Sequence, residues 1–179
     1  MSEKILAFGA SSSRNSINKK LATYAANQIE NVEVTVLDLN DFEMPIYSID
    51  KEKEGGIPEL AKQFKQYIKD TDGIIISFAE HNGAYTAAFK NIFDWISRYE
   101  KNVWEDKPMY LLATSPGGRG GKMVLDIAVN KFKFMNKNTM VSFSLPSFGQ
   151  KFSEIEGIVD VDLLKEFKAQ LATFTKAVG

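Results

Sequence analysis

Short runs of apolar residues alternate with longer amphipathic segments along the whole chain. Five of the runs are almost continuously apolar, which is typical of parallel strands covered by helices on both faces. They predict strands at residues 5–8, 32–37, 73–78, 109–114 and 139–143. Elsewhere, apolar residues recur at helical spacing. They predict helices at residues 16–29, 58–69, 84–99, 121–134 and 160–177.

Strict alternation of strand and helix predicts an α/β fold with a doubly wound, five-stranded parallel sheet and right-handed crossovers. The expected strand order is 2-1-3-4-5, with helices on both faces of the sheet. No internal repeat or interdomain linker interrupts the pattern, so residues 1–179 are expected to form one domain. The longest irregular stretch, residues 40–56, is polar and is expected to be a surface loop.

Composition narrows the class of protein. The chain has 179 residues, of which 44% are hydrophobic and 25% charged, as in soluble globular proteins. Its net charge of −1 gives no indication of binding to nucleic acid or to an anionic membrane surface. No apolar run approaches the roughly 18 residues of a membrane span, and the start resembles no signal peptide. A cytoplasmic location is therefore expected.

The segment after the first predicted strand is rich in groups that bind small anions. Loop one (residues 11–18) contains four serines, one arginine and two asparagines. Hydroxyls, amides and free backbone N–H groups at a helix N-terminus favour phosphate. The loop lacks the second and third glycines of G-x-G-x-x-G and the lysine of G-x-x-x-x-G-K-[ST]. It therefore favours a monophosphate over a dinucleotide or a nucleoside triphosphate, with ordinary helix capping as the alternative.

Two further segments follow strands that should lie beside the first. Loop two (residues 79–85) contains Asn-Gly, and loop three (residues 115–121) contains four glycines. In the order 2-1-3-4-5, the ends of strands one, three and four meet at one edge of the sheet. Loops two and three can then offer backbone groups to a flat heterocycle, because glycine permits close approach. Separately, each segment could be an ordinary turn or a flexible connection. Together with loop one, they describe a site for FMN.

The same segments resemble the motifs of the NADPH-dependent FMN reductase family, the flavodoxin-like group that includes quinone, chromate and azo-dye reductases. The family's G-S-x-R-x-x-S-x-N, P-E-Y-N-G-S and S-P-G-x-x-G-G patterns correspond to residues 10–18, 79–84 and 115–121. Its K-N-x-x-D-W and L-P-x-Y patterns are similar to residues 90–95 and 44–47. The resemblance therefore covers nearly the whole chain.

The chain departs from the family patterns at Ser13, Ala79 and His81, where the family often has arginine, proline and tyrosine. The resemblance implies a flavodoxin-like fold and an oxidoreductase with FMN as cofactor and NADPH or NADH as co-substrate. A quinone or similar small molecule would accept two electrons. A homodimer, possibly a tetramer, is also implied.

The expected cofactor-binding residues are Ser11, Ser13, Arg14, Ser16, Ile17, Asn18, Glu80, His81, Asn82, Gly83, Ser115, Pro116 and Gly117. The serines and Asn18 would bind phosphate, while loops two and three would bind the isoalloxazine edge. No side chain is expected to be catalytic, because the flavin carries the chemistry. No metal site is expected, since the chain has one histidine and no cysteine.

Other functions fit these residues less well. A phosphorelay receiver needs acidic residues after the first strand, and residues 9–11 supply none. Residues 113–117 are similar to the hydrolase pattern G-x-S-x-G, but Ala113 replaces its first glycine and the only histidine, His81, precedes Ser115. An electron-carrier flavodoxin is the main alternative. Such carriers are usually strongly acidic, whereas this chain has a net charge of −1. A domain with an empty pocket is the second alternative.

Five single residues have two interpretations each. His81 could be an ordinary loop histidine or a general base, and the first is favoured. Arg98 and Arg119 could contact a nucleotide phosphate or be solvated. Trp95 and Tyr99, four residues apart on one helix, could pack in the core or form a dimer contact.

Overall fold

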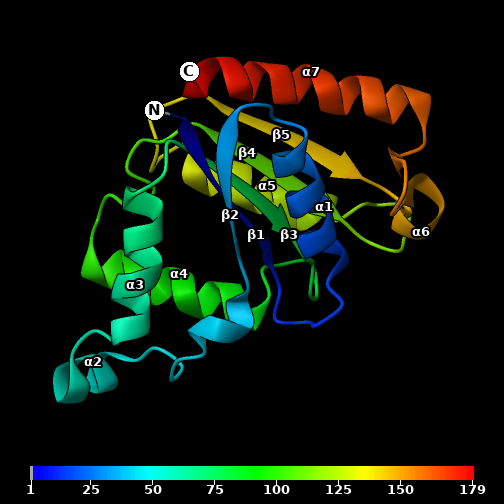
Figure 1. The fold of residues 1–179 in the computed structure, drawn as a ribbon. Helices are drawn as coiled ribbons and strands as arrows, with labels where there is room; N and C mark the ends of the chain where they lie inside the picture. Colours follow the sequence, from blue (N-terminus) through cyan, green and yellow to red (C-terminus); the bar gives the residue numbers. More distant parts are fainter. Residues whose placement is uncertain (1) are drawn as a thin grey trace.

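A computed structural model of the chain describes residues 2–179. Its centre is a parallel sheet with helices on both sides (Figure 1). The strands are β1 (Glu3–Ala10), β2 (Val32–Leu37), β3 (Gly73–Phe78), β4 (Met109–Thr114) and β5 (Met140–Leu145). They pair in the order β2-β1-β3-β4-β5, which confirms the predicted α/β class and topology.

Seven α-helices and one 3-10 helix are assigned within residues 2–179. The long helices are α1 (Ile17–Asn27), α3 (Glu59–Lys69), α4 (Ala87–Tyr99), α5 (Lys122–Phe132) and α7 (Val161–Val178). The short ones are η1 (Leu39–Phe42), α2 (Ile49–Gly55) and α6 (Phe148–Lys151). A two-stranded antiparallel hairpin, β6 (Phe152–Ser153) with β7 (Gly157–Ile158), follows α6. None of these helices combines the length and apolar character that crossing a membrane requires.

Two expectations about local structure were wrong. Residues 40–56 are not simply a loop, because they include most of η1 and all of α2. Ser48 caps α2, and its hydroxyl accepts a hydrogen bond from the Lys51 N–H. The helix predicted at residues 84–99 begins only at Ala87, because Ala84 pairs with His81 in a small hairpin.

The sheet separates two apolar layers. Alternate residues of β1 point to opposite faces: Leu6 and Phe8 pack toward α3, α4 and α5, whereas Ile5 and Ala7 pack toward α1 and α7. Both layers are built from buried aliphatic and aromatic side chains. This two-sided burial explains the nearly continuous apolar character of β1, β3 and β4, the three inner strands.

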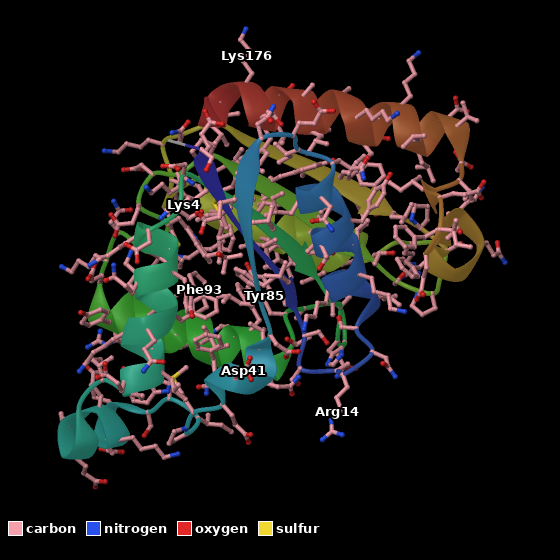
Figure 2. All side chains as sticks on the ribbon, viewed as in Figure 1. Lys4, Arg14, Asp41, Tyr85, Phe93 and Lys176 are labelled. Atoms are coloured by element: carbon pink, nitrogen blue, oxygen red, sulfur yellow. The ribbon has the colours of Figure 1, made fainter. Side chains whose placement is uncertain are left out.

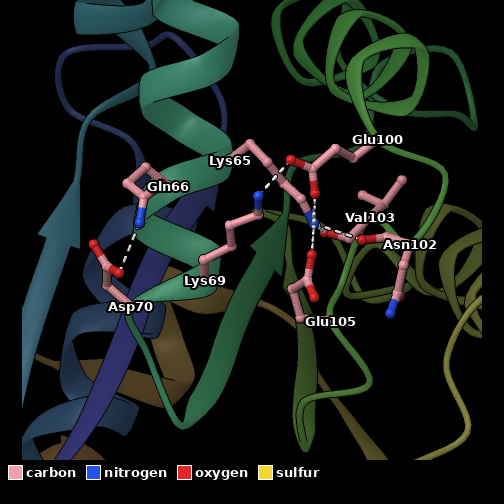
Figure 3. A network of polar contacts seen from close by, with 8 residues as sticks. All are labelled: Lys65, Gln66, Lys69, Asp70, Glu100, Asn102, Val103 and Glu105. Carbon is pink, nitrogen blue, oxygen red and sulfur yellow. Dashed lines mark hydrogen bonds and ion pairs between the residues drawn. The ribbon is translucent and has the colours of Figure 1, made fainter.

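One lysine lies inside the first of these layers. The side chain of Lys65, on α3, is 0% exposed, and its ammonium donates to the main-chain carbonyls of Asn102 and Val103. It also pairs with the carboxylate of Glu105, and Glu100 lies 3.8 Å away (Figure 3). A buried charge is tolerated only when paired and hydrogen-bonded in this way. The cluster therefore ties α3 to the segment that leads into β4.

An aromatic cluster fills the space between loop two and α4, where the side chains of Tyr85 and Phe93 lie near one another (Figure 2). The Tyr85 ring packs against Phe78 and Phe89, with centroids 5.7 and 5.1 Å away. Its hydroxyl is buried without a hydrogen-bond partner within the described residues. Burial raises the pKa of Tyr85 to about 12.

The Tyr85→Phe protein should be at least as stable as wild type at pH 7, and more stable by up to about 1 kcal/mol, because an unpaired buried hydroxyl is removed. In the unfolded chain a tyrosine loses its proton near pH 10, whereas Tyr85 in the fold keeps it until about pH 12. Rising pH over this window therefore favours unfolding. Tyr85→Phe should weaken that alkaline loss, measured by urea unfolding between pH 9 and 12.

The exposed Tyr67, changed to Phe, is the matched control. Identical alkaline profiles for the Tyr85→Phe protein and this control would contradict the assignment.

Candidate functional site

A cavity of about 340 Å³ lies at the carboxyl ends of β1, β3 and β4. It is lined by residues of all three expected loops and by Thr114, the last residue of β4. The expected site residues that line it are Ser11, Ser13, Ser16, Ile17, Asn18, Glu80, His81, Ser115 and Pro116. The fold thus brings three segments far apart in sequence to one place.

Four expected residues do not line this cavity: Arg14, Asn82, Gly83 and Gly117. Arg14 extends away from the body of the protein (Figure 2) and borders a larger groove of about 670 Å³. That groove lies between α1 and the β6–β7 hairpin and shares Asn15 and Ser16 with the smaller cavity. Arg14 is therefore at the rim of the site.

Loop one presents the N-terminus of α1 to the cavity. The Ser16 hydroxyl accepts from the Lys19 N–H at 3.2 Å and caps the helix, while the Ser11 hydroxyl accepts from the Ser13 N–H at 3.1 Å. Within residues 2–179, the backbone N–H groups of Ile17 and Asn18 have no protein acceptor. Free N–H groups at the positive end of a helix form a binding site for an anion.

The side chain of Asn18 joins loop one to two strands. It is 2% exposed, and its amide donates to the Thr114 carbonyl at 3.1 Å. Its oxygen accepts from the Thr114 N–H at 3.0 Å and from the Ser77 hydroxyl at 2.7 Å. One amide hydrogen is left for a ligand. This carboxamide was expected to bind phosphate, but most of its hydrogen bonds hold β3, β4 and α1 together.

Loop two is a tight hairpin. His81 and Ala84 exchange two backbone hydrogen bonds of 3.1 Å each. Between them, Asn82 and Gly83 have φ angles of 52° and 73°, a conformation that Asn-Gly adopts readily in two-residue turns. Within the described residues, the N–H groups of Asn82 and Gly83 have no protein acceptor. The turn therefore offers two free donors beside the cavity.

Loop three is held in place by β5 and by the segment that follows it. The carbonyl of Ser115 accepts from the Phe148 N–H at 3.0 Å, and that of Gly117 accepts from the Ser147 N–H at 2.9 Å. A side chain could not fit at Gly120, since a Cβ there would lie 2.5 Å from the Ser144 hydroxyl. Contacts from α6 and β5, which sequence reasoning did not foresee, thus hold this loop.

A further contact that sequence reasoning missed comes from Thr86. Its hydroxyl caps α4 by accepting from the Phe89 N–H at 3.2 Å, and it donates to the carbonyl of Ala10 at 2.9 Å. Loop two is thereby fastened to the end of β1. The available signal was the threonine itself, which lies inside the helix predicted at residues 84–99, because threonine is a favoured N-cap residue.

The structure also separates the alternatives for three other residues. Arg98 pairs with Glu52 on α2 through two nitrogens, at 2.9 and 3.2 Å, which keeps the pKa of that carboxyl below its usual range. Trp95 is 1% exposed and donates to the Pro45 carbonyl, so it packs in the core of its own chain. The Ser115 hydroxyl donates to the Gly117 carbonyl. No hydrogen bond joins Ser115 to His81 among residues 2–179, which disfavours the hydrolase interpretation.

The chain matches the profile of the NADPH-dependent FMN reductase family over residues 3–150. It is 32% identical over 161 residues to an NADPH:quinone oxidoreductase of Arabidopsis thaliana, covering 83% of this chain and 74% of the relative. It is 35% identical over 122 residues to a 2-hydroxy-1,4-benzoquinone reductase of Burkholderia sp, covering 67% of this chain and 64% of that protein.

Among solved structures, the fold is similar to that of FerB, a flavoenzyme NAD(P)H:(acceptor) oxidoreductase from Paracoccus denitrificans. The TM-score is 0.77 at 23% identity, with 98% of this chain and 97% of the other covered. This likeness supports the flavodoxin-like topology described above.

Replacing Asn18 with alanine should lower the free energy of unfolding of the flavin-free protein by about 2–4 kcal/mol. The change removes three hydrogen bonds and leaves the buried Ser77 and Thr114 groups unpaired. Urea denaturation measures the effect. Asn15→Ala is the matched control, because Asn15 is exposed and its side chain makes no hydrogen bond within the described residues.

The control should change stability by less than about 0.5 kcal/mol. Similar losses of stability in the two variants would show that Asn18 does not hold the strand ends together.

Proposed function

We propose that FMN binds in the 340 Å³ cavity, because the chain belongs to the NADPH-dependent FMN reductase family. Members of this family are NAD(P)H-dependent enzymes that use FMN. We further propose that two electrons pass from that cavity to a quinone or a similar small acceptor. The observation that carries the proposal is the meeting of three strand-end loops, each with backbone groups free for a ligand, around one cavity.

Loop one would hold the phosphate. The free N–H groups of Ile17 and Asn18 lie at the positive end of the α1 dipole, and the Ser13 hydroxyl lines the cavity without a hydrogen bond of its own within residues 2–179. These are neutral donors combined with a partial positive charge. They fit a phosphate monoester even though serine stands where the family often has arginine.

Loops two and three would hold the edge of the isoalloxazine ring. The Asn82 and Gly83 N–H groups could donate to its polar atoms, and the backbone of Ser115–Gly117 would approach from the other side. The chemistry that FMN supplies when bound is uptake of a hydride from NAD(P)H and delivery of two electrons. The protein contributes alignment and fixed dipoles.

The proposed acceptor class rests on the relatives, two of which are named for quinone reduction. The site itself supports a broad class, because most of the residues that line it have small side chains (Ser, Ala, Thr or Pro). We also propose the homodimer that the resemblance implies, and the cytoplasmic location that the sequence led us to expect. We propose that the second copy would contact the surface beside α4, where Ile46 is 75% exposed and lines a groove together with Met44 and Ile92.

Purified protein should bind FMN with a visible flavin spectrum and should bind riboflavin more weakly. Ser13→Ala should weaken FMN binding about tenfold to a hundredfold, the effect of losing a hydrogen bond to a charged group of roughly 1.5–3 kcal/mol. Riboflavin binding should hardly change. Titration followed by flavin fluorescence measures both dissociation constants.

Ser12→Ala is the matched control for this experiment, because Ser12 is the neighbouring serine and does not line the cavity. The phosphate assignment fails if Ser13→Ala weakens FMN and riboflavin equally, or if Ser12→Ala has the same effect.

His81→Gln should retain most NAD(P)H oxidation, because the His81 side chain is exposed and makes no hydrogen bond within residues 2–179. Any effect should fall on the KM of the acceptor. Stopped-flow measurement of flavin reduction at saturating FMN tests this. A loss of 10²-fold or more would match general acid–base catalysis and would overturn the assignment of His81 as a loop residue.

A further inference from the structure

The first turn of α5 has no capping side chain of its own. Its N-cap position is Gly121, with a φ of 70°, so no side chain there can accept a hydrogen bond. The N–H of Val124 instead donates to the carboxylate of Glu80 at 3.1 Å, 44 residues earlier in the chain. A carboxylate at this end of a helix gains both a charge-assisted hydrogen bond and a favourable interaction with the helix dipole.

A second contact joins the same two segments. The methyl group of Met123 lies against Gly83, where an added Cβ would be only 3.1 Å away. Met123 and Val124 are consecutive residues in the first turn of α5. Loop two therefore contacts the first turn of α5 at two places. Glu80, just before the hairpin, makes one contact, and Gly83, within its turn, makes the other.

From these contacts we infer that Glu80 is a positioning residue for the flavin. Its carboxylate fixes the base of the hairpin to α5, and the fixed hairpin holds the free N–H groups of Asn82 and Gly83 in one place. Glu80 was expected to bind the edge of the isoalloxazine ring. We infer that it acts on this edge indirectly, by holding the hairpin in place. Its link to FMN rests on the proposed function.

Tyr85 and Thr86, which follow the hairpin, hold its C-terminal end through aromatic packing and a hydrogen bond to Ala10, but the turn itself has few other contacts. The His81–Ala84 pair closes the turn on itself, and the side chains of His81 and Asn82 make no hydrogen bond within residues 2–179. Without Glu80, the turn would keep its own shape but lose its only hydrogen bond to α5 within residues 2–179, and the contact of Met123 with Gly83 would remain. Misplacement of donors by about 1 Å is enough to slow a reaction substantially.

Three variants separate positioning from general stability. Glu80→Ala removes the acceptor, and Glu80→Gln keeps an oxygen at the same reach. Asp160→Ala is the matched control, since Asp160 caps α7 in the same way, accepting from the Leu163 N–H at 3.1 Å away from the cavity. Each protein is tested for amide hydrogen exchange without flavin, for the FMN dissociation constant, and for flavin reduction by NADPH at saturating FMN.

Glu80→Ala should speed exchange of the Val124 amide and slow flavin reduction about tenfold to a hundredfold. Glu80→Gln should restore both values to within about threefold of wild type. Asp160→Ala should lower stability and leave FMN binding and flavin reduction unchanged.

The inference is overturned if Glu80→Ala leaves exchange of the Val124 amide unchanged. It is equally overturned if flavin reduction in that variant stays at the wild-type rate, or falls no further than in Asp160→Ala. Failure of wild type to bind FMN would instead contradict the proposed function. In that case, exchange in the flavin-free variants alone decides whether Glu80 anchors the hairpin.

Discussion

Neighbouring parallel strands can form a binding site only if the segments that leave them are held together without using up their backbone donors. Around loops one and two, side chains make these links. The buried carboxamide of Asn18 bonds to the ends of β3 and β4, and the Thr86 hydroxyl bonds to the end of β1. Because side chains carry these links, the N–H groups at the start of α1 and in the hairpin stay free. The free donors around the cavity therefore depend on these side-chain hydrogen bonds.

The same arrangement explains why the proposed phosphate site needs few formal charges. The free N–H groups and the dipole of α1 supply partial positive charge at fixed positions. Arg14 lies at the rim, and Arg98 is occupied by Glu52. Fixed neutral donors discriminate by geometry, and the effect of the helix dipole falls off within the first turn. Recognition at this cavity is therefore expected to depend on shape more than on long-range attraction.

Much of the architecture could be predicted from the sequence, because burial on both faces leaves a strong local signal. The bounds of β3 and β4 follow directly from apolar runs, and the predicted bounds of β2, in which valines alternate with polar residues, are also those of the structure. The meeting of loops one, two and three follows from strand order. These features depend on the pattern of whole segments and tolerate variation at single positions.

Contacts between distant residues could not be predicted, because nothing local marks them. The Glu80–Val124 bond spans 44 residues, and the Asn18–Thr114 bond spans 96. By contrast, α2 did leave a local signal, a serine followed by acidic residues in the first turn. The helix was not predicted because α2 has few apolar residues. Sequence reasoning thus predicted which loops meet around the cavity, but it assigned to ligand binding some side chains, such as that of Asn18, that also hold the fold together.

The buried ammonium of Lys65 has a consequence for how this sequence can change over time. Its partners are two main-chain carbonyls, which no substitution can remove, and the carboxylates of Glu105 and, at 3.8 Å, Glu100. Losing the lysine alone would leave carboxylates facing one another, and losing Glu105 alone would leave a buried cation under-paired. Effects of substitutions at these positions are therefore non-additive. Homologues are expected to exchange the lysine and its acidic partners together, so that covariation, and not the identity of any one residue, would mark this part of the fold.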